Sequence, residues 1–321
     1  MQTRSDAAKL ETVGQAQPAG TAPDEEVRKA LLALDRQRPR RLGNILVGAL
    51  IVCVGAVFCF ALAVNPALDW ETFGAYFFSD MMLAGVQTTL VLTAFSLVGT
   101  MVLAVPVAVA RMSSNFILDR LSRLYVWFFR AIPLLVLVIL AFNIALIFPT
   151  ISLSLPFGPE LFSVQTNNVI SGFWAGVIAF SLHQSAYTSE IIRGALQAVP
   201  RGQWEASRAL GLFPWTIFRR IVLPQAVRIA FPSLGNEAIH ILKNTSMIAF
   251  ISVADVLYSA QQIYNSNFAV IPLLLVATVW YLVLITALSF VQNLMERKQR
   301  NSARVSVKPS KQREQESKAN T

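Results

Sequence analysis

Charged residues are scarce in the central part of this chain, and their distribution limits the folds that it can adopt. The 253 residues from 43 to 295 contain 11 Lys or Arg and 9 Asp or Glu, whereas residues 1–42 alone contain 8 and 6. The central basic residues occupy short segments between long uncharged apolar runs. A run of about 20 apolar residues crosses the hydrocarbon core as a helix. The pattern therefore predicts an all-α integral membrane protein with polar ends.

Six segments have the composition of membrane-spanning helices. They are Leu42–Val64, Leu83–Ala110, Ala131–Phe148, Val169–Ser189, Ile229–Val253 and Phe268–Leu294. The fifth segment is the least regular, because it carries Pro232, Gly235 and several polar or charged residues, and it could be divided into two pieces. Residues 1–41 and 296–321 are predicted to be an N-terminal tail and a basic C-terminal tail.

The loops between these segments differ in charge. Loops 65–82, 149–168 and 254–267 contain no Lys or Arg, whereas the alternate loops and both tails contain many. Loops rich in Lys and Arg remain on the cytoplasmic side of a membrane. We therefore predict that both termini are cytoplasmic. The tails should be attracted to anionic membrane lipid. Nucleic-acid binding is not expected, because the charges are scattered and lack interleaved aromatic residues.

The segment between the fourth and fifth spans is amphipathic. Residues 201–210 can form a short helix that a left-handed Gly211 ends. Pro214 can begin a second helix, and Leu223-Pro224 is expected to end it. Two short helices with exposed apolar residues on the inner face of a membrane protein predict a docking element for a soluble partner.

The spacing in this segment resembles the EAA loop of binding-protein-dependent ABC importer permeases, here residues 190–226. The family pattern is E-A-A, three residues, G, nine residues and I-x-L-P. The residues that match it are Glu205, Ala206, Ser207, Gly211, Ile221, Leu223 and Pro224, with Ser207 in place of the second Ala.

Two flanking segments are similar to the polar amino acid branch of the same family. They begin at Ala186 (A-Y-T-S-E-I-I-R-G) and at Leu242 (L-K-N-T-S). In an earlier segment, Ala131, Ile132 and Leu137 stand where this branch usually has Gly, Thr and Gln. The resemblance covers about residues 83–295. It implies a five-helix ABC importer permease domain preceded by one extra transmembrane helix, residues 42–64.

The resemblance also implies a function and a set of partners. The chain would be a permease subunit in the bacterial inner membrane that translocates a polar amino acid. An extracytoplasmic, periplasmic binding protein would deliver the amino acid. A cytoplasmic ABC ATPase dimer would bind ATP and Mg and act on the permease through the EAA loop, so the chain itself needs no cofactor and is not expected to be an enzyme. The second permease subunit could be another copy or a different chain. In agreement, the sequence contains no G-x-x-x-x-G-K-[ST] nucleotide-binding motif.

Polar residues at membrane depth form two stripes at helical spacing. The first contains His183, Gln184, Tyr187 and Glu190, and the second contains Asn236, Glu237, His240 and Lys243. We expect both stripes to face the interior of the bundle, and part of them, without Glu190, to line the substrate path, because a zwitterion needs donors for its carboxylate and acceptors for its ammonium group. Hydrogen bonds and ion pairs between helices are the alternative interpretation. Metal binding is not expected from this spacing.

Two other functions remain to be weighed. An ion-coupled secondary amino acid transporter usually contains inverted repeats with broken helices in both halves, but only the fifth span here has interrupting residues. A membrane enzyme would need a nucleophile, a zinc-binding pair or a carboxylate pair at membrane depth, and none is evident. The sequence leaves open which amino acid is carried.

Overall fold

The computed structural model describes residues 41–154 and 160–305. The predicted N-terminal tail and most of the C-terminal tail lie outside this range. The chain divides into two units, residues 1–64 and 65–321. The described part of the first unit is helix α3 (Arg41–Val64), a continuous apolar helix of 24 residues that corresponds to the first predicted span.

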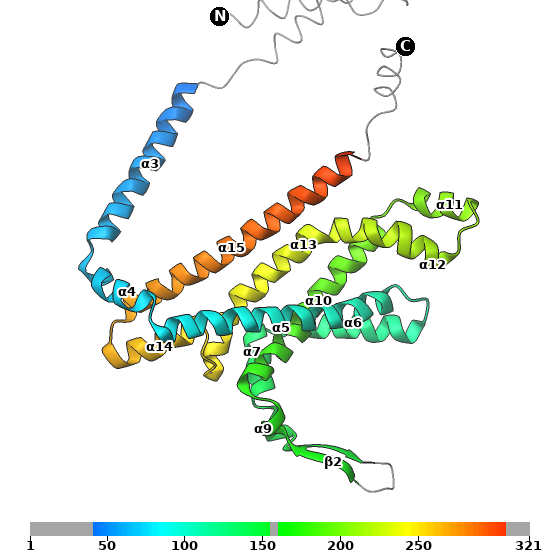
Figure 1. Cartoon of the computed structure of the whole chain (residues 1–321), viewed down its shortest axis with the longest axis horizontal. Helices are drawn as coiled ribbons and strands as arrows, with labels where there is room; N and C mark the ends of the chain where they lie inside the picture. The colour runs from blue at the N-terminus through cyan, green and yellow to red at the C-terminus, as the bar shows by residue number, and fades with distance from the viewer. Residues whose placement is uncertain (1–40, 155–159, 306–321) are drawn as a thin grey trace, which may run out of the picture. The chain divides into compact units, whose positions relative to one another are not determined.

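The second unit consists mainly of helices joined by short turns (Figure 1). Its first elements are η2 (Pro66–Leu68), α4 (Trp70–Phe77), α5 (Asp80–Arg111), α6 (Phe116–Ala131), α7 (Leu134–Phe142), α8 (Ile144–Ile147), β1 (Thr150–Ser154), β2 (Glu160–Gln165) and α9 (Thr166–Val169). The elements that follow are α10 (Gly172–Gln197), α11 (Arg201–Ala209), α12 (Pro214–Ile217), η3 (Phe218–Val222), α13 (Leu223–Asn244), η4 (Thr245–Ile251), α14 (Val256–Asn267) and α15 (Val270–Val305).

The predicted number of six spans is not confirmed. Within the described residues, three helices are long and apolar enough to cross a membrane, namely those in Gly43–Val64, Asp80–Arg111 and Val270–Gln299. The number rises to five if each of two bent pairs is one span. The predicted fourth span corresponds to α10, which has 26 residues but is less apolar than these helices.

The predicted third span, residues 131–148, is not a single helix. Helices α6 and α7 meet at an angle of 99°, and Ile132 between them is extended, with φ −83° and ψ 129°. The following Pro133 explains this break, because a residue before proline is driven out of the helical region. Helix α6 therefore occupies the segment predicted as a polar loop, and it packs beside α5 and α10.

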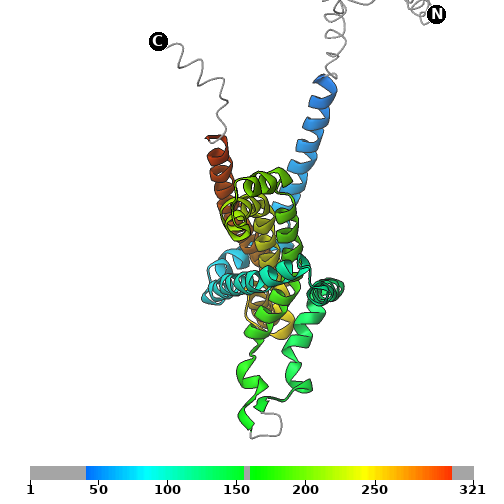
Figure 2. The same cartoon turned by 90° about the vertical axis from the view of Figure 1, so that its right-hand side faces the viewer.

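Strands β1 and β2 form an antiparallel pair within the segment 149–168, which was expected to be a loop in an all-α protein. Strands β1 and β2 pair Ile151 with Val164 and Ser152 with Ser163, so apolar and polar side chains alternate between its two faces. Figure 2 shows the hairpin extending away from the helices of its unit.

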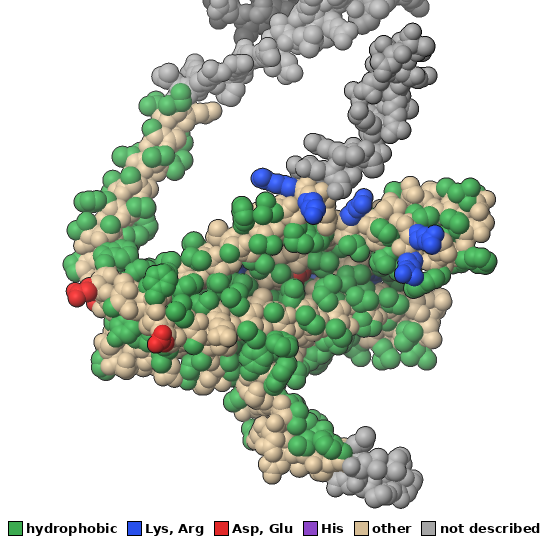
Figure 3. Space-filling model, in the orientation of Figure 1, with side chains coloured by type: hydrophobic (Ala, Val, Ile, Leu, Met, Phe, Trp, Pro, Cys, Tyr) green, Lys and Arg blue, Asp and Glu red, His purple; other side chains and the backbone are tan. Residues whose placement is uncertain are grey.

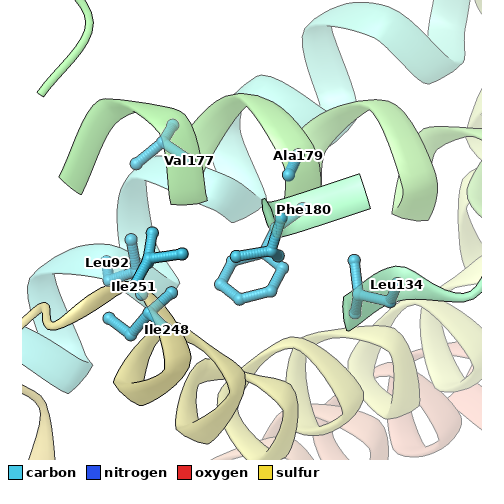
Figure 4. Close-up of a cluster of buried hydrophobic side chains, with 8 residues drawn as sticks. Leu92, Leu134, Val177, Ala179, Phe180, Ile248 and Ile251 are labelled. Atoms are coloured by element: carbon cyan, nitrogen blue, oxygen red, sulfur yellow. The ribbon is translucent and has the colours of Figure 1, made fainter. Parts of the chain in front are cut away.

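Helix α10 is the centre of the second unit. It packs against α5, α6, α7 and α13, and its Phe180 is buried beside Leu92, Val138 and Ile248 (Figure 4). Small residues let these helices approach closely. At Gly99, for example, an added Cβ would lie only 2.2 Å from Ser181 Oγ. A buried helix surrounded by protein does not need an apolar surface for lipid, which explains the polar composition of α10.

A buried polar cluster joins α5, α14 and α15. Asp255 is completely buried. Its Oδ1 accepts a hydrogen bond from the Tyr258 backbone N–H (2.8 Å) and thereby caps α14, and its Oδ2 accepts one from the Tyr281 hydroxyl (2.7 Å). Thr89 of α5 accepts a hydrogen bond from the Val256 backbone N–H (3.3 Å). The carboxylate thus joins α14 to α15, and the Thr89 hydroxyl joins α5 to the start of α14.

Candidate functional site

The segment that resembles an EAA loop forms a helix, a left-handed turn and a second helix. Helix α11 ends at Ala209, and Gly211 follows with φ +72°. The N–H groups of Gly211 and Leu212 donate to the carbonyls of Arg208 (2.9 Å) and Ser207 (3.2 Å). These two bonds satisfy the last carbonyls of the helix and require the left-handed residue between them. The predicted first helix, the turn at Gly211 and the start of the second helix at Pro214 are confirmed.

The predicted end of the second helix at Leu223-Pro224 is wrong. Helix α12 continues through η3, a π-helical turn, into α13 without a break. Pro224 is the second residue of α13 and lies inside this continuous helix, where it has no N–H to donate to the preceding turn. The π-helical turn before it accommodates a backbone that does not follow the regular α-helical register. The segment that resembles an EAA loop therefore continues without interruption into the helix that carries the second polar stripe.

One side of this segment is anchored and the other is exposed. Ile217 and Val222 are buried with Val199, and Trp204 packs against them. Glu205 and Ala206 are exposed, as are the large apolar residues Leu210, Phe213 and Trp215, whereas Ser207 is buried. Ile221 is half-buried, and Leu223 and Pro224 are exposed.

Charge is segregated along the second unit. Figure 3 shows Lys and Arg side chains near the C-terminal part of α15 and over α11 and α12, whereas Asp and Glu side chains lie around α4 and the start of α5. The exposed apolar side chains of Leu210, Phe213 and Trp215 lie in the same region as these basic residues. An exposed apolar surface of this kind is suited to a protein partner.

The first polar stripe faces α6 within the second unit. The rings of His183 and Tyr187 are 5.2 Å apart, and the Arg130 guanidinium lies 4.8 Å from the Tyr187 ring. Gln184 is buried. The prediction that these residues face the bundle is confirmed. Arg130 was not among the predicted site residues, because it lies in the segment predicted as a loop.

Glu190 at the end of this stripe is an ion-pairing residue. Its carboxylate accepts from Arg111 Nε of α5 (2.9 Å) and from Arg193 Nη2 (2.7 Å). This part of the stripe follows the alternative interpretation, in which polar residues join helices.

The second stripe lines a cavity of about 440 Å³. The lining residues are Ile191, Ser233, Asn236, Glu237, Ile239, His240 and Lys243. Asn236, His240 and Lys243 are exposed in the single chain, so the expectation that they face the interior of the bundle is wrong. Helix α13 packs against α10 and α15 on its other sides. Polar side chains of a membrane helix do not face lipid, so this face is suited to an aqueous path or to another protein chain.

Glu237 is the half-buried member of this cavity. Its Oε2 atom is buried and has no hydrogen-bond partner among the residues that the structure describes. A buried carboxylate oxygen without a donor is costly, and this atom keeps its capacity to accept hydrogen bonds. The two stripes do not meet here. Ile191 is the residue of α10 that lines this cavity, and His183, Gln184 and Tyr187 do not line it.

Gln292 of α15 is a second residue that sequence reasoning missed. Its Nε2 donates to Asn236 Oδ1 (3.4 Å), to Glu296 Oε1 (2.8 Å) and to the Pro232 carbonyl (3.2 Å). A Cβ at Gly235 would lie 2.4 Å from Gln292 Cδ, so a larger residue there would require the Gln292 side chain to move. The only sequence signal for this contact was Gly235, a small residue within a polar stretch that lets another side chain approach the helix.

Across residues 41–154 and 160–305, no three His, Cys, Asp or Glu residues are grouped as metal ligands.

Comparison with known proteins decides the family. The profile of the family described as binding-protein-dependent transport system inner membrane component matches residues 100–301. The chain belongs to this family. Its members are the transmembrane component of ABC importers, and the ATPase of such an importer is a separate subunit. The predicted resemblance to amino acid ABC importer permeases is confirmed.

Two relatives and one solved structure give the extent of the similarity. The chain is 35% identical over 260 residues to an arginine transport system permease protein of Corynebacterium glutamicum, with 80% of each chain covered. It is 34% identical to an L-cystine transport system permease protein of Bacillus subtilis, with 74% of this chain and 94% of the relative covered. A crystal structure of an amino acid ABC transporter with histidines matches with a TM-score of 0.57 and 30% identity, over 68% of this chain and 94% of the other.

Proposed function

We propose that this permease translocates a polar amino acid across the inner membrane, delivered by an extracytoplasmic binding protein and driven by a separate ABC ATPase. The observation that carries this proposal is the cavity on α13, where Asn236, Glu237, His240 and Lys243 gather on a helix of a membrane protein. Charged residues of both signs can bind both ends of a zwitterion. Relatives of this chain are named for the transport of arginine and of L-cystine.

A second permease subunit would complete the cavity. The exposed side chains of Asn236, His240 and Lys243 would otherwise face lipid at a considerable free-energy cost. A partner helix on this face would enclose the substrate between the two subunits. Either a second copy of this chain or a different permease chain satisfies this argument.

The segment that resembles an EAA loop, residues 190–226, is called the coupling segment below. It would transmit the movement of the ATPase. The exposed Glu205, Leu210 and Phe213 form the surface for the partner. Because α12 is continuous with η3 and α13, a displacement of the docked segment would move the helix that lines the cavity. Rigid-body movement of packed elements is a common way to switch a site between two states.

Replacement of Glu237 by Gln should reduce substrate uptake about tenfold. We propose that its unpartnered Oε2 accepts a hydrogen bond from the substrate ammonium group, and a charge-assisted hydrogen bond contributes about 1.5–3 kcal/mol. Uptake into proteoliposomes that contain the whole importer measures the effect. Glu71→Gln is the matched control, because Glu71 is exposed in α4 and should have no effect. Equal uptake by the two variants would remove Glu237 from the proposed substrate path.

Reconstitution with partners tests the function itself. We expect labelled arginine, cystine or another polar amino acid to enter proteoliposomes only when the chain, its ATPase, its binding protein and ATP are present together. Competition by unlabelled amino acids would identify the substrate. Uptake by the isolated chain under an ion gradient alone would instead support a secondary transporter.

A further inference from the structure

A second cavity, lined by arginines, lies between the end of α5 and α6. Its volume is about 440 Å³, and its lining residues are Arg111, Arg123, Val126, Trp127, Arg130 and Ala131. No acidic residue is among them. Three guanidinium groups line one cavity, and arginine is suited to planar, bidentate contact with carboxylate and phosphate groups.

The nearby acidic residues orient these arginines without using all their donors. Arg111 donates through Nε to Glu190 (2.9 Å), and Arg123 donates through Nε to Asp119 (2.9 Å). Among the residues that the structure describes, these bonds leave the two η nitrogens of each guanidinium for another acceptor. Arg130 is held by its contact with the Tyr187 ring. The cavity is thus a set of oriented donors, as binding of an oxyanion requires.

The surface around the cavity is apolar. Helix α6 exposes large side chains at Leu121, Leu124, Trp127 and Phe128, of which Trp127 is 66% exposed and also lines the cavity. Figure 3 shows hydrophobic side chains over much of the visible surface of α5 and α6. A free anion needs only the donors, whereas a phospholipid needs donors for its phosphate and an adjacent apolar surface for its acyl chains.

We propose that Arg111, Arg123 and Arg130 bind the phosphate of an anionic phospholipid whose acyl chains lie against the apolar surface of α6. The site is on the side of the membrane that the basic loops predict as cytoplasmic, and it differs from the general attraction of the tails to lipid. It is also separate from the α13 cavity, so it does not depend on the proposed substrate path. The bound lipid would brace α6 against α5 beside the bend at Pro133.

Lipid retention by the purified full chain tests this site. The probe is phosphatidylglycerol, mixed with an equal amount of phosphatidylcholine during reconstitution, and native mass spectrometry measures the lipids that remain bound after extraction. Arg123→Gln should lower phosphatidylglycerol retention about fivefold, since a basic residue near anionic lipid contributes on the order of 1 kcal/mol. Phosphatidylcholine retention should not change.

Arg120→Gln is the matched control. Arg120 lies on the same helix but contacts the Phe116 ring and does not line the cavity, so its replacement should leave retention of both lipids unchanged. Circular dichroism of both variants checks that α6 still folds. Equal losses of phosphatidylglycerol in the two variants, or equal retention of both lipids by the unmodified chain, would overturn the proposal.

Inorganic phosphate at millimolar concentration is the third arm of the experiment. If phosphate displaces phosphatidylglycerol and its binding depends on Arg123 in the same way, the lipid assignment is wrong and the ligand is a free oxyanion.

Discussion

Replacement of Gly211 by Ala should reduce substrate-stimulated ATP hydrolysis by the assembled importer about tenfold. Gly211 has φ +72°, and a residue with a Cβ pays roughly 1–2 kcal/mol in this left-handed conformation. No atom lies within 4 Å of the added Cβ, so the backbone alone causes the effect. The turn would open, and Leu210 and Phe213 would no longer present one surface to the ATPase.

Two further variants separate backbone strain from other causes. Gly202→Ala is the matched control, because Gly202 also has open space around it but lies within helix α11, where alanine is favourable. Gly211→Asn should restore part of the activity, since asparagine tolerates the left-handed region better than alanine. If Gly211→Ala hydrolyses ATP as fast as Gly202→Ala, the turn does not couple the two subunits in the way we propose.

Replacement of Asp255 by Ala should lower the free energy of unfolding of the second unit by about 3 kcal/mol or more. The change leaves the Tyr281 hydroxyl and the Tyr258 N–H without their acceptor in a part-buried position, and each unsatisfied buried group costs about 1–3 kcal/mol. Unfolding of the full chain in mixed micelles of increasing SDS content, followed by circular dichroism, measures the loss.

Asp69 provides the comparison for this prediction. It also caps a helix, by accepting from the Thr72 N–H (3.2 Å), but this hydrogen bond is exposed. Asp69→Ala should therefore cost much less than Asp255→Ala, because water can replace an exposed acceptor. Asp255→Asn should fall between the two Ala variants, because the amide oxygen can still accept one of the two bonds. Similar losses for Asp255→Ala and Asp69→Ala would show that the buried cluster does not hold α5, α14 and α15 together.

Local sequence signals predicted the features that depend on neighbouring residues. Gly211 and Pro214 define the turn of the coupling segment because one permits a positive φ and the other suits the first turn of a helix. The apolar runs of α3, α5 and α15 are long enough to identify spanning helices. The break at Ile132 could also have been predicted from the sequence, since the residue before a proline leaves the helical region. The prediction of a single span there relied on hydropathy alone.

Packing decided the features that local signals do not contain. Hydropathy does not show which side of α13 is covered, and the position of α10 and α15 left Asn236, His240 and Lys243 exposed. Likewise, nothing near Gln292 in the sequence indicates that it reaches Asn236 through the space at Gly235.

The composition and charge distribution of the sequence predicted a helical membrane protein, and the resemblance of its local motifs predicted an importer permease, because these features lie within short stretches of the chain. Only the tertiary structure decided which polar residues share a cavity and which form ion pairs. Arg111 approaches Glu190 although 79 positions separate them, and Tyr281 approaches Asp255 across 26. Such contacts depend on how whole helices pack, and helical periodicity within one segment does not specify its neighbours.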